Sequence, residues 1–375
     1  HLIFIVKIKK IMTICLIGKN LTTLVLSKIF INKGINVDLY EYDNKMSKNV
    51  SQIKSRTIGL SNDSIEFLNS HKILNKKDCW EIKKINLYNG ESSKSFLNFE
   101  SKKGSFFMMS YNNFYKSLEV SLKKNKLIKI KKKSGQKSFL NLIKKKYELI
   151  IVADTNNSVF KKYFTKNIKK SYDSIAFTSI IDHDSVKNKV AIQHFTKFGP
   201  LAFLPISKSQ TSIVFSVFNK DLIKNKENVV KLIKHYNNYY KIKNISKFQQ
   251  FPINLSLSRN YFHKNILSFG NALHKIHPLA GQGFNMTLRD AKILSELVKN
   301  NLDLGLNLDT VLEKFEVKRK NSNFVFAMGV DFLHEFFKMV NKYNMKSIDN
   351  LFKFINRNIF IKKKIQSFAD KGFIL

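Results

Sequence analysis

Cysteine is nearly absent from this sequence. Among 375 residues there are two, Cys15 and Cys79, and neither belongs to a CxxC pair, so a disulfide framework is excluded. Cys15 lies inside an apolar run and is predicted to be a small core residue. The shortage of cysteine favours a protein of the reducing cytoplasm.

Long apolar runs are also lacking. None approaches the roughly 20 residues that a membrane-spanning helix needs. Residues 1–11 carry no small-residue cleavage site, so we do not expect a signal peptide there, and Met12 leaves open whether that segment is native. The content of hydrophobic residues, 43%, is that of a globular chain with a sizeable core.

Arginine is scarce as well. Only five of the 66 basic residues are arginine, and the lysines behind the net charge of +39 are spread along the whole chain. Glycine and proline are few, whereas lysine, asparagine, isoleucine and phenylalanine abound, which is the bias that AT-rich codons produce. A nucleic-acid partner requires a clustered basic stripe, so none is predicted. A diffusely basic surface favours anionic lipid head groups, so we expect a cytoplasmic protein that is either free or peripheral at the inner face of the membrane.

The order of apolar runs predicts an α/β fold. A strand at 13–17, a helix and a strand at 37–41 form a β-α-β unit at the start. Two further strands, 147–153 and 266–269, would return to the same sheet from either side of a strand-rich segment, 172–218. This order is typical of a Rossmann-like domain interleaved with a β-sheet substrate domain.

The other predicted elements depend on weaker patterns. Lysine-laced apolar residues over 126–143 predict a pair of strands. The C-terminal region is predicted to be helical, at about 283–300, 308–338 and 346–358.

The first β-α turn carries part of a dinucleotide fingerprint. The pattern Gly-x-Gly-x-x-Gly lets backbone approach a pyrophosphate at a helix N-terminus, and here it reads Gly18-Lys-Asn20-Leu-Thr-Thr23. Asn20 tolerates left-handed backbone, but its side chain fills space that a phosphate would need. Thr23 is expected to loosen the packing of helix on strand. Glu41, which ends the second strand, is placed to bind ribose hydroxyls.

The segment Phe269-Gly-Asn-Ala-Leu-His-Lys-Ile-His-Pro-Leu-Ala-Gly-Gln-Gly-Phe-Asn-Met286 is far more specific. It resembles the flavoprotein aromatic hydroxylases, in particular the UbiH/UbiF-type branch of ubiquinone biosynthesis. The matching residues are Gly270, Ala272, His274, Pro278, Ala280, Gly281, Gln282, Gly283, Asn285 and Asp290.

Further landmarks follow in the same order as in that family. Arg56–Ser61 is similar to its arginine segment, Val152–Ser158 to its Ala-Asp-Gly motif, and Gly199–Pro205 to its substrate-sheet signature. The region 304–337, with Phe315 and Arg319, is similar to its C-terminal helix. The resemblance thus covers nearly the whole chain.

The resemblance implies an NAD(P)H- and O2-dependent monooxygenase. Reduced FAD would form a C4a-hydroperoxide that hydroxylates the ring of a polyprenylated phenol, and other ubiquinone-biosynthesis proteins would be partners. The FAD-binding domain would comprise residues 12–80, 111–170 and 256–375, and the substrate domain residues 81–110 and 171–255. The ring position attacked, the choice of NADH or NADPH and the oligomeric state stay open.

The implied site residues fall into two groups, and no side-chain acid or base is among them. The body of FAD would contact Gly18, Glu41, Arg56, Asp154, Gly270 and Asn271. The flavin ring would lie against Pro278, Gly281, Gln282, Gly283, Phe284 and Asn285. No metal is predicted, because the pair His274 and His277 has no third ligand at suitable spacing.

Four residues depart from the family pattern: Asn20, Thr23, Thr155 and Asn271. Asn271 replaces an aspartate and so loses a charge-assisted acceptor. These departures leave two hypotheses, a monooxygenase with a weak FAD site and a flavin-poor relative that serves as a structural subunit of a biosynthetic assembly.

Overall fold

The structure is a computed structural model of the 375-residue chain. It describes residues 12–42, 56–90, 92, 94–101, 104, 106–133, 135–145, 147–218, 226–277, 281–343 and 354–372.

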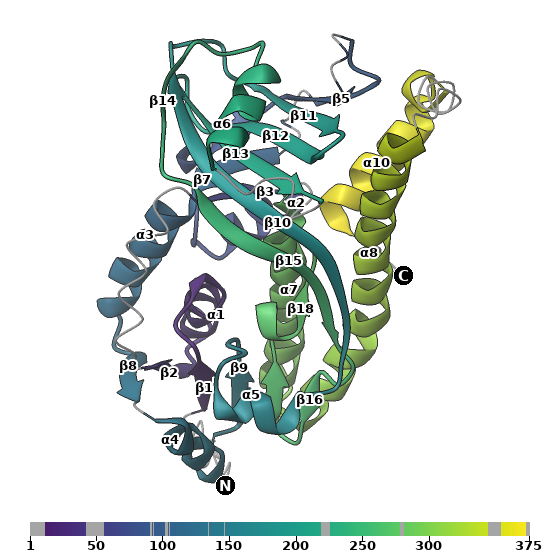
Figure 1. The fold of residues 1–375 in the computed structure, drawn as a ribbon. Helices are drawn as coiled ribbons and strands as arrows, with labels where there is room; N and C mark the ends of the chain where they lie inside the picture. The colour runs from purple at the N-terminus through teal and green to yellow at the C-terminus, as the bar shows by residue number, and fades with distance from the viewer. Residues whose placement is uncertain are drawn as a thin grey trace, which may run out of the picture.

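A six-stranded sheet forms the base of the molecule (Figure 1). Its strands are parallel except for the antiparallel pair at one edge. In spatial order they are β16 (Phe262–His263), β17 (Ile266–Ser268), β9 (Leu149–Val152), β1 (Thr13–Ile17), β2 (Asn36–Tyr42) and β8 (Ile128–Lys133).

Side chains of β1 alternate between two buried faces. Ile14 and Leu16 belong to the core formed with α1 (Leu21–Ile31), α3 (Tyr111–Lys123) and α7 (Gln282–Asp303). Cys15 and Ile17 pack on the opposite face against α4 (Gln136–Leu140) and α5 (Ser158–Tyr163). Full burial of each aliphatic side chain contributes roughly 2 kcal/mol, which explains why this strand is apolar throughout.

A nine-stranded sheet lies above the first (Figure 1). Two of its strands, β10 and β15, are long and reach down to the edge of the six-stranded sheet that carries β16. The order is β18 (His274–Lys275), β15 (Gln249–Ser258), β10 (Asn167–His183), β13 (Gln210–Val217), β12 (Gly199–Pro205), β11 (Val190–Thr196), β5 (Lys84–Asn89) and β6 (Leu97–Glu100), with β14 (Ile242–Ile245) beside β10.

A small sheet and several helices complete the fold. A small sheet has the order β3 (Thr57–Leu60), β7 (Phe106–Ser110) and β4 (Trp80–Ile82). Helix α8 (Asp309–Tyr343) runs beside α7, and α10 (Ile359–Lys371) packs against α8 through Phe368 on Phe326 (Figure 1). The other helical segments are α2 (Asn62–Ser70), α6 (Lys226–His235) and short 3-10 turns at Lys76–Asp78, Asn141–Lys144 and Gly270–Ala272.

The predicted fold class is confirmed, including the β-α-β start and both returning strands. The strand pair predicted over 126–143 is wrong in its second half. After β8 the chain turns at Gly135 and forms α4, because Phe139 and Leu142 at helical spacing both bury against the base sheet. The helix predicted at 346–358 lies largely outside the described residues, since 344–353 are not among them.

Candidate functional site: the carboxyl edge of the parallel sheet

Three loops meet at the carboxyl edge of the base sheet, after β1, β9 and β17. Gly18 has φ +98°, and a Cβ there would lie 2.8 Å from the Cβ of Asp154. Gly270 has φ +59°, and a Cβ there would lie 3.0 Å from Cγ2 of Thr22 on α1. Both positions therefore require glycine, for backbone conformation and for space. In parallel α/β sheets this edge is where ligands bind.

Helix α1 begins at this edge with its N-terminus closed by the chain itself. Oδ1 of Asn20 accepts a hydrogen bond from the Thr23 amide at 3.2 Å, and Oγ1 of Thr23 accepts one from the Asn20 amide at 3.1 Å. Nδ2 of Asn20 donates to the carbonyl oxygen of Ala153 at 3.0 Å. Asn20 is thus an extended N-cap, with φ −140°, whose side chain also ties α1 to the end of β9.

Thr23 does not loosen the packing of α1. Its side chain is fully buried, and its hydroxyl donates to the carbonyl oxygen of Gly18 at 2.6 Å. The expectation of looser packing is therefore wrong, because the hydroxyl satisfies a backbone acceptor in the turn that it contacts.

A hollow of about 510 Å³ opens beside this turn, at the ends of β2 and β8. Nζ of Lys19 lies 3.3 Å from Oε2 of Glu41 and 2.6 Å from Oε1 of Glu119. The hydrogen bond from Lys19 holds the pKa of Glu119 below its ordinary value. The residues that line the hollow are Lys19, Glu41, Lys123, Ile128, Ile130 and Lys132. The lining thus combines four charged side chains with two isoleucines.

Asp154 and Asn271 take up separate positions at the edge. Oδ1 of Asp154 accepts a hydrogen bond from the amide of Asn156 at 2.9 Å, so one oxygen of this carboxylate is bonded within the loop after β9. Asn271 lies exposed on the 3-10 turn after β17, and Thr155 is also exposed. Arg56 is exposed at the start of β3, where its guanidinium lies 4.8 Å from the ring centre of Tyr111.

Helix α7 begins differently from α1. Gly281 takes the left-handed conformation with φ +64°, and no side chain of the described residues caps this end. A Cβ on Gly281 would lie 3.6 Å from the amide nitrogen of Gly59 in β3. The backbone amides at this end, with the positive end of the helix dipole, are suited to an electron-rich acceptor.

Asn285 fixes that helix start in place. Its Nδ2 donates to the carbonyl oxygen of Gly59 and its Oδ1 accepts from the amide of Ser61, both at 3.0 Å. Asn285 is 1% exposed, so its bonds to β3 and to the residue that follows it are shielded from water. Gln282, Gly283 and Phe284 are half-buried beside it, while residues 278–280, Pro278 among them, lie outside the described residues.

A buried charge network lies behind α7, and the sequence reasoning did not assign it a role. The Asp290 carboxylate accepts from Nε2 of His274 and from Nε of Arg319, both at 2.6 Å, and from Nδ2 of Asn323 at 3.0 Å. Asn323 also reaches the Tyr261 hydroxyl at 3.2 Å. Burial alone would raise the pKa of Asp290, but Arg319 and His274 outweigh it and lower it to about 2. The network joins α7, α8 and the loop after β17.

His277 and His334 form a second buried cluster. Their rings lie 4.2 Å apart, and Tyr172 of β10 meets the His334 ring edge-on at 4.7 Å. The Tyr172 hydroxyl donates to Asp331 at 2.6 Å. Burial is the main cause that lowers the pKa of His277 to about 3 and that of His334 to about 4. Both imidazoles are therefore neutral at physiological pH.

His274 and His277 thus have different partners, since one bonds Asp290 and the other packs against the His334 ring at a tilt of 36°. Among the described residues no group of three histidine, cysteine or acidic side chains could hold a metal ion.

The buried histidines predict a pH-dependent stability. Between pH 6.5 and about 4 the unfolded chain protonates a histidine that stays neutral in the fold, so stability falls by about 1.4 kcal/mol per pH unit for each such histidine. His334→Phe should reduce the loss of unfolding free energy per pH unit by the contribution of one histidine. The exposed control His235→Phe should leave that slope unchanged. Urea unfolding at several pH values measures the slope, and equal slopes in all three proteins contradict the assignment.

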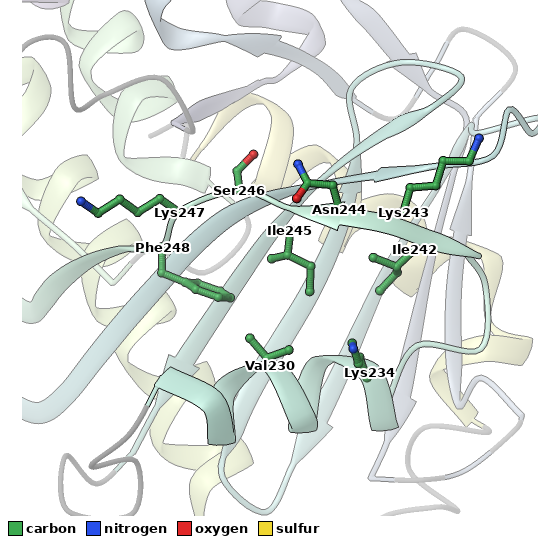
Figure 2. A pocket seen from close by; sticks show the side chains of 9 residues that line it. All are labelled: Val230, Lys234, Ile242, Lys243, Asn244, Ile245, Ser246, Lys247 and Phe248. Atoms are coloured by element: carbon green, nitrogen blue, oxygen red, sulfur yellow. The ribbon is translucent and has the colours of Figure 1, made fainter.

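A second hollow, of about 460 Å³, lies between α6 and β14 (Figure 2). Ile242 and Ile245 of β14, and Phe248 after it, point toward Val230 of α6, whereas Asn244 points away on the other side. The side of the strand that faces the helix is therefore apolar, although lysine side chains also line the hollow. This hollow lies in the second sheet, apart from the loops that follow β1, β9 and β17.

Known proteins share this architecture. The p-nitrophenol 4-monooxygenase PnpA from Pseudomonas putida DLL-E4 superposes with a TM-score of 0.77 at 11% identity, covering 97% of this chain and 100% of that one. HpxO from Klebsiella pneumoniae, solved with FAD and uric acid, superposes with a TM-score of 0.72 at 10% identity, over 97% and 98%.

Sequence relatives cover less of the chain. The ubiquinone biosynthesis monooxygenase COQ6 of Danio rerio is 25% identical over an alignment 231 positions long, which covers 50% of this chain and 47% of that protein. The 3-demethoxyubiquinol 3-hydroxylase of Escherichia coli (strain K12) is 28% identical over 150 residues, 38% of each chain. The chain thus spans about half the length, or less, of the curated relatives it matches.

The fold is the one that the monooxygenase PnpA and FAD-bound HpxO share, and it defines a structural class. Within that class the model of the squalene epoxidase family matches residues 146–366, more than half of the chain, so the chain belongs to that family. Its similarity to COQ6 and to the E. coli hydroxylase confirms the resemblance to ubiquinone-biosynthesis hydroxylases.

Proposed function

We propose that this chain is an FAD-dependent monooxygenase that hydroxylates the aromatic ring of a polyprenylated phenol in ubiquinone biosynthesis, with NAD(P)H as reductant. One observation carries the proposal: the left-handed start of α7 at Gly281, which no described side chain caps and which Asn285 holds against β3. Such an end suits the electron-rich pyrimidine edge of a reduced flavin. The similarity to COQ6 and to the E. coli hydroxylase supports the substrate class.

The residues at the edge fit FAD unequally along its length. The start of α7 fits the ring, and the hollow beside Glu41 fits the adenosine. The diphosphate would lie at the start of α1, where the Asn20 side chain must first move aside. When bound, FAD supplies the redox and oxygen chemistry, and the chain supplies orientation and a dry pocket.

The phenol ring would lie between the start of α7 and β12, which carries Gly199–Pro205. Neutral His277 and His334 stand at the junction of the α7 loop, β10 and α8. Because neither imidazole carries a charge at neutral pH, this junction is a neutral, water-shielded part of the fold near the proposed ring position.

A membrane surface is the proposed workplace, since the prenyl tail of the substrate partitions into lipid. Helix α8 exposes Val317, Phe324, Phe332 and Met339, which recur at seven- to eight-residue spacing and so share one side of the helix. Helix α10 adds exposed Phe360, next to the run Lys362–Lys364. This combination supports peripheral binding to anionic lipid. Within the described residues, no helix is long and apolar enough to cross a bilayer.

The test is product formation by the purified, FAD-loaded chain. With NAD(P)H and a short-chain prenylated phenol we expect oxygen consumption and a product heavier by one oxygen atom, which derives from isotopically labelled oxygen gas. If the chain holds FAD and oxidises NAD(P)H but hydroxylates none of the phenolic precursors, the substrate assignment is wrong.

The second candidate is a flavin-poor relative that acts as a structural subunit of a ubiquinone-biosynthesis assembly. The observation that favours it is the closed start of α1, where Asn20 and Thr23 satisfy each other. This candidate predicts stable association with other proteins of that route and no flavin bound at any FAD concentration.

A further inference from the structure

The N-terminus of α1 is satisfied before any cofactor arrives. In the dinucleotide fingerprint a phosphate accepts hydrogen bonds from the backbone amides at this helix end. Here Oδ1 of Asn20 already accepts from the Thr23 amide at 3.2 Å. Nδ2 of the same side chain is held by the carbonyl oxygen of Ala153 at 3.0 Å. The Asn20 side chain therefore occupies the amide and the space that a diphosphate would use.

The charged residues beside the start of α1 do not displace the Asn20 side chain from it. Lys19, which precedes Asn20 in the turn, pairs with Glu41 and Glu119 and so points away toward β2 and α3. Its ammonium is shared between two carboxylates and adds no free positive charge at the helix start. The Asn20 cap is the obstacle that lies directly at the helix end.

We propose that Asn20 is an affinity-determining residue, whose side-chain cap on α1 competes with the diphosphate of FAD for the same helix end. This inference rests on the proposed function, since it takes FAD to be the ligand. It explains how an intact flavin-ring end can coexist with an altered fingerprint. When the chain binds FAD, the Asn20 side chain must break its hydrogen bonds to the Thr23 amide and to the Ala153 carbonyl oxygen.

Removing the cap should therefore tighten FAD binding. Breaking each hydrogen bond of the cap raises the Kd for FAD by about a factor of five. Asn20→Gly, which has no such bonds to break, should therefore lower the Kd about 10- to 30-fold. Asn20→Ala should do nearly the same, because the extended backbone at this position accepts any residue. Asn20→Asp should weaken FAD binding, since a carboxylate keeps the cap and repels the diphosphate.

The chain offers a matched control. Asn358 caps α10 through the same bond, its Oδ1 accepting from the Ile361 amide at 3.1 Å, far from the sheet edge in sequence. Asn358→Gly removes an equivalent cap and should leave the Kd for FAD unchanged. Riboflavin, which has no diphosphate, is the second control, and its Kd should be the same in the Asn20 variants as in the unaltered chain.

Quenching of flavin fluorescence, with FAD or riboflavin titrated into the purified full chain, measures all these constants. A Kd for FAD that falls in Asn20→Gly and Asn20→Ala alone, with riboflavin unaffected, supports the proposal. A Kd for FAD equal in the unaltered chain and both variants overturns the proposal and leaves the monooxygenase function standing. Failure of every protein, including the uncapped variants, to bind FAD overturns both.

Discussion

Replacing Asp290 with asparagine should lower the free energy of unfolding by about 3–5 kcal/mol. Asp290 is fully buried and accepts hydrogen bonds from His274 and Arg319, both at 2.6 Å. The substitution keeps the shape but leaves the Arg319 guanidinium buried without its counter-charge, and an uncompensated buried charge costs that amount. Because Asp290 joins α7 to α8 and to the loop after β17, the start of α7 should also lose its fixed position.

Chemical denaturation of Asp290→Asn beside the unaltered chain measures this loss. The control is Asp184→Asn, which breaks an exposed ion pair with Lys243 at 2.6 Å and should leave stability within error. Equal stability of Asp290→Asn and the unaltered chain would show that the network contributes little to the fold.

A second large effect is expected at Gly199, at the start of β12. Its φ is +133°, and a Cβ there would lie 1.9 Å from the carbonyl oxygen of Ser216 in β13. Gly199→Ala therefore combines a strained backbone with a clash against the neighbouring strand. We expect it to lower the free energy of unfolding by about 4 kcal/mol. The clash can be relieved only by moving β12 from β13, so the sheet that faces α7 should be disturbed as well.

Gly34→Ala separates the two causes. Gly34 also has positive φ, +74°, but a Cβ there meets no atom of the described residues within 4 Å. Gly34→Ala should lower the free energy of unfolding by about 1–2 kcal/mol, because only the backbone conformation is strained. If thermal unfolding shows the two variants to be equally stable, the close approach of Gly199 to β13 is not a constraint on the fold.

Sequence patterns predicted the β-α-β start and the returning strands because each depends on local apolar periodicity. The strand pair over 126–143 was predicted wrongly, because Phe139 and Leu142 fit a buried helix as well as a strand, and tertiary packing on the base sheet decides between them.

The candidate site was predicted in part. The glycines at 18, 270 and 281 lie at strand and helix ends, where their positive φ and close contacts explain the motif. The Asp290 network could not be derived in the same way, because its members come from positions 274, 290 and 319 and meet only in the folded chain. The cap on α1 was also missed, since Asn20 was expected to tolerate left-handed backbone and is extended.

The central claim is that the carboxyl edge of the parallel sheet is an FAD site. The most direct test is a titration of the purified chain with FAD, followed by its visible difference spectrum. We predict a saturable change in the flavin bands that approaches one FAD per chain and tightens in Asn20→Gly. A flavin spectrum that stays that of free FAD at every concentration, in both proteins, would contradict the claim and favour the structural subunit.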